Sequence, residues 1–228
     1  MKRFYLETFG CQMNVHDSEK VAGTLLACGW QRVDRPEEAD LILYNTCSIR
    51  SKAEHKVYSR LQQLRHWAGQ KRFGVLGCVA QQEGMRIFER VPHVNLVCGS
   101  ASYRRLPELL AQLERGDCRV AGLELEPNET FDTPYVARED HYRAYVTIIE
   151  GCDKSCTYCV VPFTRGPERS RTSQSIMEEV RRLADQGYTE VTLLGQNVTS
   201  YQDPSPARWD FATLLARVAE VPGLRRVR

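Results

Sequence analysis

Short apolar runs alternate with helical patterns through the first 116 residues, and this alternation restricts the fold more than any other feature of the sequence. The strand-like runs lie at 3–9, 40–45, 72–77 and 93–99, and the helical patterns lie at 16–29, 48–70, 81–91 and 103–116. Strands that alternate with helices form a parallel sheet covered by helices. Within the first helical pattern, Val21, Leu25 and Cys28 share a face, and Gly29 stands where a C-terminal cap belongs.

A polar stretch then separates two such series. Residues 117–140 contain two prolines and many acids, which is typical of a linker. The second series occupies 141–228, with expected strands at 144–151 and 190–197, helices at 173–187 and 210–221, and a third strand beginning within 224–228. Ser175 and Glu178 are spaced as a capping box for the first of these helices.

The second series is too short for a closed barrel. A complete (β/α) barrel takes roughly 200 residues or more. Residues 141–228 are therefore expected to be the first βα units of a longer barrel, with a small open α/β layer as the alternative.

Composition excludes several classes of protein. Of the 228 residues, 42% are hydrophobic and 26% are charged, and the net charge of +2 neither demands nor excludes a nucleic-acid partner. No apolar run has the length of a membrane span, and the N-terminus lacks a signal-peptide core, so we expect a cytoplasmic protein without a membrane partner. Nine cysteines are many for such a chain. In a reducing compartment they indicate metal chemistry rather than disulfides.

Three of the cysteines lie within nine residues. Cys152, Cys156 and Cys159 have the spacing C-x3-C-x2-C and follow directly on the expected strand at 144–151. A structural zinc site takes four ligands, usually from two paired motifs. Three thiolates suit a 4Fe-4S cluster in which they bind three irons and the fourth iron stays open for chemistry. The carboxyl end of a strand is also where active-site loops collect in βα folds.

A second set of cysteines is dispersed along the chain. Cys11, Cys47 and Cys78 each come just after a candidate parallel strand, so all three can converge on one edge of the sheet. Cys98 also ends a strand, and this geometry alone does not exclude it. Cys28 and Cys118 are expected to fill the core.

Several independent motifs resemble the methylthiotransferase family of radical S-adenosylmethionine (SAM) enzymes. The motifs are ETFGCQMN, YNTC, GCVAQ, GCDKSCTYCVVPFTRGPERSR and LLGQNVTSY. Tyr158, between the last two cysteines, agrees with the pattern. The resemblance implies a Rossmann- or flavodoxin-like cluster domain over 1–116, followed by a partial radical SAM barrel.

The resemblance also implies cofactors and a reaction. SAM would bind the open iron of the cluster at Cys152, Cys156 and Cys159, and would be cleaved reductively to methionine and a 5′-deoxyadenosyl radical. Cys11, Cys47 and Cys78 would bind an auxiliary 4Fe-4S cluster that carries the sulfur. Cys98 would then not be a ligand of this cluster.

The motifs are most similar to the branch of the family that acts on tRNA. The substrate would be N6-isopentenyladenosine at position 37, and the product would be its 2-methylthio derivative. Related branches act on threonylcarbamoyladenosine in tRNA or on an aspartate of a ribosomal protein. An electron donor and a sulfur source would be further partners. The family's RNA-binding TRAM domain and the remainder of the barrel are missing from these residues, so we expect this fragment alone to be inactive.

Other candidate residues are ambiguous. Gly195, Gln196 and Asn197 end the expected strand at 190–197 and either contact SAM or form a simple turn. Three arginines after the cysteine loop either meet the SAM carboxylate or a tRNA phosphate, or form a solvated basic loop; these are Arg165, Arg169 and Arg171.

Two further groups of polar residues have competing explanations. Asn14 and Asn45 flank the dispersed cysteines and either support the cluster surroundings or serve ordinary turns. Five basic residues of one long helix are a solvated face or a tRNA contact; these are Arg50, Lys52, Lys56, Arg60 and Arg65.

Two rival functions remain open at this point. A two-cluster redox carrier would need four protein thiolates for each cluster, which two sets of three do not supply. A zinc-stabilised RNA-binding module would contain zinc and no iron.

Overall fold

A computed structural model describes residues 2–125 and 133–228 and divides the chain into two compact units. Among the described residues, the first unit comprises 2–125, 133–137 and 163–165, and the second comprises 138–162 and 166–228. Residues 126–132 of the predicted linker lie outside the described residues. No helix among the described residues is long and apolar enough to cross a membrane.

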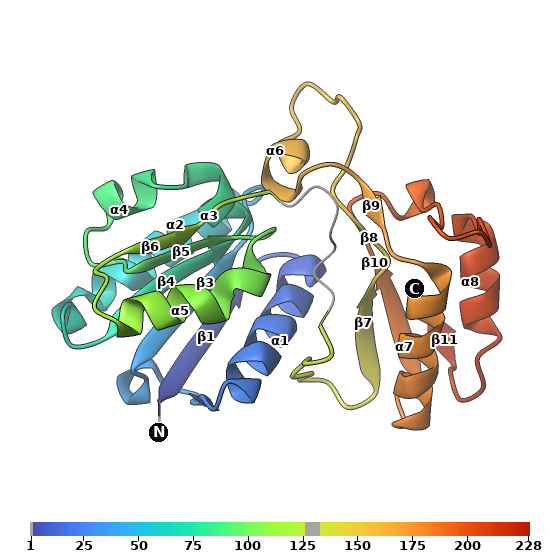
Figure 1. The fold of residues 1–228 in the computed structure, drawn as a ribbon, viewed down its shortest axis with the longest axis horizontal. Helices are drawn as coiled ribbons and strands as arrows, with labels where there is room; N and C mark the ends of the chain where they lie inside the picture. The colour runs from blue at the N-terminus through green and yellow to red at the C-terminus, as the bar shows by residue number, and fades with distance from the viewer. Residues whose placement is uncertain (1, 126–132) are drawn as a thin grey trace. The chain divides into compact units, whose positions relative to one another are not determined.

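The first unit is built on a six-stranded parallel sheet (Figure 1). Its strands lie in the spatial order β2-β1-β3-β4-β5-β6. Their bounds are β1 Arg3–Phe9, β2 Gln31–Arg32, β3 Leu41–Thr46, β4 Arg72–Gly77, β5 Leu96–Gly99 and β6 Val120–Gly122. The α/β class and the parallel sheet that the sequence predicted are confirmed.

Helices cover both faces of this sheet. The helices are α1 Gln12–Ala27, α2 Ser51–Gln63, α3 Cys78–Glu83, α4 Arg86–Arg90 and α5 Leu106–Glu114, with short 3-10 turns at Pro36–Glu38, Arg65–Trp67 and Tyr103–Arg105. Alternation along the strands explains the two layers. In β3, Leu43 packs with α1 and α5, and Tyr44 packs with α2 and α4 on the other face.

Several predicted boundaries in this unit differ from the structure. The first helix begins at Gln12, four residues before the predicted start, because Cys11 and Asn14 cap it. The predicted helix at 81–91 is two short helices that break at Gly84, whose φ is +53°. The predicted linker at 117–140 contains β6, which pairs with β5, so the sheet extends beyond residue 116.

Burial separates the cysteines that lie outside the two triads. Cys98 is fully buried in the layer beneath α1 and α5, as expected of a packed residue. Cys28 and Cys118 are exposed, so their predicted role in the core is wrong. Cys28 follows the last turn of α1, where Gly29 turns the chain with a φ of +83°.

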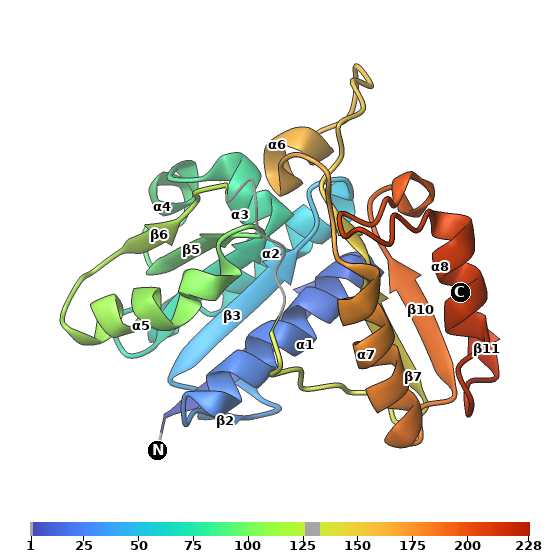
Figure 2. The same ribbon diagram turned by 45° about the vertical axis from the view of Figure 1, so that its right-hand side comes forward.

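The second unit has a three-stranded parallel sheet with the order β11-β10-β7. Its elements are β7 Arg143–Thr147, β8 Ile149–Glu150, β9 Arg169–Ser170, α7 Ser173–Asp185, β10 Glu190–Leu194, a 3-10 turn Val198–Ser200, α8 Phe211–Ala219 and β11 Arg226–Val227. Helix α6 Val161–Arg165 is divided between the units, since its residues 163–165 belong to the first. Helices α7 and α8 pack against the strands through one apolar layer (Figure 2). The predicted third strand is present as β11.

Two local predictions in the second unit are wrong. The N-cap of α7 is Thr172, whose hydroxyl accepts from the Ser175 backbone N–H, so Ser175 does not start the helix. The predicted strand at 144–151 divides into β7 and β8, and β8 pairs antiparallel with β9. This second pairing draws together the two ends of the cysteine loop.

Candidate functional site

Three adjacent strands of the first unit end at the dispersed cysteines. Strand β3 lies between β1 and β4, with Thr46 in register with both Phe9 and Gly77. Cys47 and Cys78 are the next residues after their strands, and Cys11 comes two residues after β1. The structure therefore brings these three cysteines to one edge of the sheet, as the parallel topology predicts.

The thiols of Cys11 and Cys47 are hydrogen-bonded to each other. A hydrogen bond from Cys47 is the main cause that lowers the pKa of Cys11 to about 5, against the opposing effect of burial. The first backbone N–H groups of α1 act in the same direction. The same hydrogen bond, together with burial, raises the pKa of Cys47 well above its ordinary value. At neutral pH the pair therefore holds one thiolate, which is the form that binds soft metals.

The donors at this edge are soft ligands. Within residues 2–125 and 133–228, no three His, Cys, Asp or Glu side chains are grouped to hold one metal ion. A 4Fe-4S cluster takes cysteine thiolates and bonds each of them to a different iron. Three cysteines at the ends of three neighbouring strands, with one ionised at neutral pH, are the kind of ligand that such a cluster takes.

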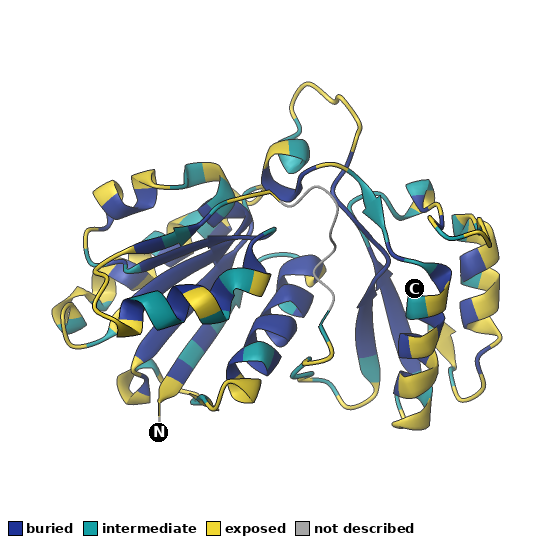
Figure 3. Cartoon of the chain, viewed as in Figure 1, coloured by how far each residue is buried: buried dark blue, intermediate teal, exposed yellow. Residues whose placement is uncertain are grey.

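The second triad lies on one loop of the second unit. Gly151 starts the loop with a φ of +79°, and a side chain there would collide with the Gly166 carbonyl. The Cys152 N–H donates to that same carbonyl over 3.2 Å, which closes the base of the loop. Cys152 is buried, whereas Cys156 is exposed. The far end of the loop is coloured as exposed in Figure 3. The loop thus has a closed base and an open tip.

Two further residues complete the loop. The Cys159 N–H donates to the Cys156 carbonyl over 3.0 Å, which forms a tight turn between the last two cysteines. Tyr158, in that turn, is 90% exposed. The described residues cover little of its side chain, so packing does not explain a tyrosine at this position.

The end of β10 contacts this loop through one side chain. The Gln196 amide oxygen accepts from the Gly151 N–H over 2.5 Å. Gly195 lies so close to Ile149 that a side chain would not fit there. Asn197 bonds only within its own turn among the described residues, to Thr199 and Ser200. Of the three predicted residues, Gln196 is the one with a direct contact to the cysteine loop.

The arginines after the loop are held in buried ion pairs. Arg169 lies 3.5 Å from Glu150. Arg171 lies 2.7 Å from Glu179 and also donates to the Thr147 carbonyl over 3.0 Å. The alternative of a solvated basic loop is therefore wrong for both arginines. Their acidic partners were not predicted, because acids in amphipathic stretches usually face solvent.

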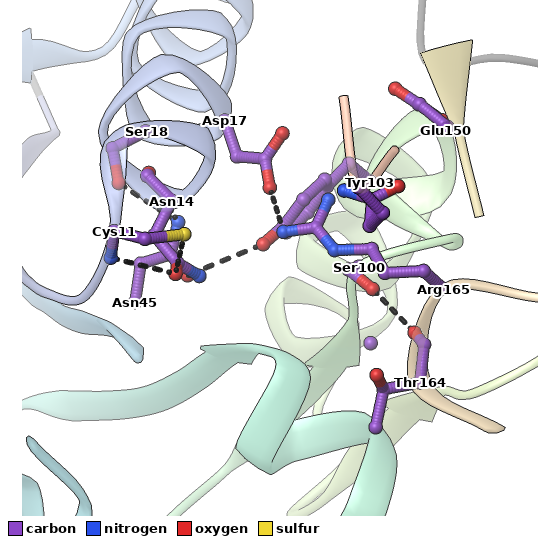
Figure 4. A network of polar contacts seen from close by, with 12 residues as sticks. Cys11, Asn14, Asp17, Ser18, Asn45, Ser100, Tyr103, Glu150, Thr164 and Arg165 are labelled. Atoms are coloured by element: carbon purple, nitrogen blue, oxygen red, sulfur yellow. Dashed lines mark hydrogen bonds and ion pairs between the residues drawn. The ribbon is translucent and has the colours of Figure 1, made fainter. Parts of the chain in front are cut away.

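Arg165 is grouped with the first unit. Its guanidinium lies 2.7 Å from the Asp17 carboxylate, and both side chains are almost fully buried (Figure 4). The neighbouring Thr164 carbonyl accepts from the Ser100 hydroxyl over 2.7 Å. The alternative of a solvated basic loop is therefore wrong for Arg165 as well, and its contact with SAM or tRNA stays a prediction. Asp17 was missed because it stands in a charged stretch of the first helix.

The basic residues along α2 are partly engaged by the first unit itself. Arg50 donates to the Gly10 carbonyl over 3.0 Å, and Arg60 lies 3.6 Å from Glu7. The Lys56 ammonium lies 5.8 Å from the centre of the Phe9 ring. These contacts give half-exposed charges a local role, and a contact with tRNA stays a prediction.

Known proteins match both halves of the chain. The profile described as "Uncharacterized protein family UPF0004" matches residues 3–99, which include Cys11, Cys47 and Cys78. The profile of the "Radical SAM superfamily" matches residues 146–227, which include the cysteine loop. A protein of Solibacter usitatus named "tRNA-2-methylthio-N(6)-dimethylallyladenosine synthase" is 70% identical over 228 residues, covering 100% of this chain. Over its whole length the chain is therefore similar to a methylthiotransferase, and residues 146–227 match the radical SAM superfamily.

Other matches agree with this similarity. A protein of Koribacter versatilis with the same name is 59% identical over 229 residues. The chain spans about half the length of these relatives, 51% in each case. A solved radical SAM methyltransferase, TsrM from Kitasatospora setae, superposes with a TM-score of 0.60 at 13% identity, covering 99% of this chain and 54% of the other. At that identity the superposition supports the fold and nothing more.

Proposed function

We propose that this chain is part of a radical SAM methylthiotransferase that converts N6-isopentenyladenosine at position 37 of tRNA to its 2-methylthio derivative. The observation that carries the proposal is the name shared by relatives 70% and 59% identical over the whole chain. The two sets of three cysteines support it, because each set leaves a cluster position for chemistry.

Each triad has a proposed role. Cys152, Cys156 and Cys159 would bind the cluster that meets SAM, and Cys11, Cys47 and Cys78 would bind the auxiliary cluster. When bound, the clusters supply an electron for the reductive cleavage of SAM and a sulfur atom for transfer. The target is an unactivated ring C–H, from which no side-chain base removes a proton at neutral pH.

The chain's own residues would prepare these sites. The hydrogen bond between Cys152 and the Gly166 carbonyl closes the base of the loop, and the exposed tip leaves Cys156 accessible. Gln196 would hold the start of the loop and present its amide nitrogen toward SAM. Tyr158, which is 90% exposed, would cover bound SAM. Gly195 and Asn197 would shape the same region. Because Arg165 is paired with Asp17, it would fix the position of residues 163–165 rather than bind SAM.

The test uses a protein that contains this chain at the length of its relatives. It would be reconstituted anaerobically with iron and sulfide and then incubated with SAM, a reductant and tRNA that bears isopentenyladenosine. Nucleoside analysis should reveal the 2-methylthio product. Activity only on threonylcarbamoyladenosine, or only on a ribosomal-protein aspartate, would move the chain to a different branch of the family. Clusters that exchange electrons without cleaving SAM would favour the redox carrier.

A further inference from the structure

The side chain of Asn45 occupies the centre of the sheet edge that bears the dispersed cysteines. It is fully buried in β3, two residues before Cys47. Its amide nitrogen donates to the Asn14 carbonyl over 3.0 Å and to the Ser18 hydroxyl over 2.9 Å. Its amide oxygen accepts from the Asn14 side chain and from the Tyr103 hydroxyl, each over 3.3 Å. A neutral amide has two donors and two acceptor positions, so all four are in use (Figure 4).

These bonds connect Asn45 to the segment that holds Cys11. Asn14 is the third residue of α1, and Cys11 is its N-cap. The Asn14 amide oxygen lies 3.3 Å from both the backbone nitrogen and the sulfur of Cys11. A chain of hydrogen bonds therefore runs from the Cys11 backbone N–H through the Asn14 side chain to Asn45.

Asn45 also borders the segment that holds Cys78. Gly77 precedes Cys78 and has a φ of +92°, a backbone conformation that favours glycine. A side chain at Gly77 would collide with the Asn45 amide oxygen. One side chain thus meets all three segments: its own strand before Cys47, the start of α1 after Cys11, and the turn before Cys78.

We propose that Asn45 is a positioning residue that sets the spacing of Cys11, Cys47 and Cys78 without binding the metal itself. The inference rests on the proposed cluster at these cysteines. An aspartate would match the shape of Asn45 but would place an acceptor against the Asn14 carbonyl and bury a charge. Loss of a hydrogen bond that orients ligands commonly weakens metal binding by about ten- to a hundredfold.

The chain offers a matched control at the opposite end of the same sheet. Asn95 precedes β5, and its amide bonds the Phe73 N–H and the Cys118 carbonyl over 3.1 and 3.0 Å. Asn95→Asp makes the same chemical change in a residue that also joins neighbouring segments of the sheet by hydrogen bonds. It lies away from Cys11, Cys47 and Cys78. It measures what general loss of stability does to iron binding.

The experiment compares Asn45→Asp and Asn95→Asp in the 228-residue chain with Cys152, Cys156 and Cys159 changed to Ala, so that only the sheet-edge site takes up iron. After reconstitution, iron content, electron paramagnetic resonance of the reduced cluster and release of iron to a chelator would be measured, beside thermal unfolding of the metal-free chains. Asn45→Asp should release iron about tenfold faster and alter the resonance. Asn95→Asp should lose stability and keep the parental release rate.

The outcomes separate the inference from the proposed function. If the parent takes up no iron, the proposed auxiliary cluster fails. If the parent takes up about four irons and Asn45→Asp releases them at the parental rate, the inference fails. It also fails if both variants release iron in proportion to their lost stability. Should Asn45→Asp not fold, Tyr103→Phe removes one of the four bonds and should give a smaller acceleration with an intact fold; an unchanged rate there would overturn the proposal.

Discussion

The two cysteine triads are organised by opposite means. Cys11, Cys47 and Cys78 come from three strands that only the folded sheet brings together, and their surroundings are buried and hydrogen-bonded. Cys152, Cys156 and Cys159 share one loop whose base is closed and whose tip is exposed. A sheet edge fixes the direction of each ligand before metal arrives, whereas a loop leaves room for a second molecule beside the metal. The difference suits a site that stores a sulfur atom and a site that admits SAM.

The largest expected effect comes from deleting each triad in a protein of the relatives' length. Changing Cys152, Cys156 and Cys159 to Ala should leave the iron of one cluster, about four atoms per chain. The variant should form neither 5′-deoxyadenosine nor the methylthio product. Changing Cys11, Cys47 and Cys78 to Ala should retain some 5′-deoxyadenosine and abolish the methylthio product. Circular dichroism must first establish folding, because metal binding can supply folding energy. Methylthioadenosine made by a folded variant without the sheet-edge triad would contradict the division of roles.

A smaller effect tests which cysteine completes the sheet-edge site. Cys78→Ser should remove the auxiliary cluster, about half of the iron. Cys98→Ser should leave the iron unchanged and cost about 1–3 kcal/mol of unfolding free energy, because a hydroxyl replaces a thiol in an apolar layer. Iron analysis and chemical denaturation measure the two quantities. The reverse pattern would make Cys98 the third ligand.

The contact between Gln196 and Gly151 sharpens the description of the loop. Gln196→Leu removes the acceptor and should accelerate iron loss from the loop triad by about tenfold. Gln196→Glu retains an acceptor and should keep the iron; if it nevertheless weakens SAM binding, the amide nitrogen contacts SAM. Asn197→Leu, which disturbs the neighbouring turn without removing this contact, is the control for iron loss. Equal iron loss from Gln196→Leu and Asn197→Leu would reduce the contact to ordinary turn stability.

The smallest expected effect concerns the ionisation of the sheet-edge thiols. Because the pKa of Cys11 is lowered to about 5, its thiolate persists as the pH falls until that value is reached. In the metal-free chain at pH 6.5, alkylation of Cys11 should be about fivefold faster than in the same chain unfolded in urea. Peptide mapping by mass spectrometry across pH 4–9 gives the midpoint of the reaction. A midpoint near that of an ordinary thiol would show that the coupling to Cys47 is absent.

The sequence predicted these two sites unequally. Three cysteines in nine residues are visible without any fold, so the loop could be recognised from spacing alone. The convergence of Cys11, Cys47 and Cys78 followed only once strands were assigned, and it succeeded because parallel strands end at a common edge. Strand β6 was missed because three residues in a polar stretch have no periodicity of their own. Asn45 could be suspected of a role but not assigned a partner, and Asp17 was missed, since Tyr103 and Arg165 are distant in sequence.

The shared proton of Cys11 and Cys47 has a practical consequence. A thiolate beside a thiol is the arrangement from which a disulfide forms when an oxidant such as dissolved oxygen accepts the two electrons. In the metal-free chain, one oxidation would therefore remove two of the three sheet-edge ligands at once, while the loop triad could still be filled. Under the proposed function, metal-free protein that is exposed to air and then reconstituted anaerobically without a thiol reductant would take up about half of the iron. It would then cleave SAM without transferring sulfur, so the thiols should be reduced before iron is added.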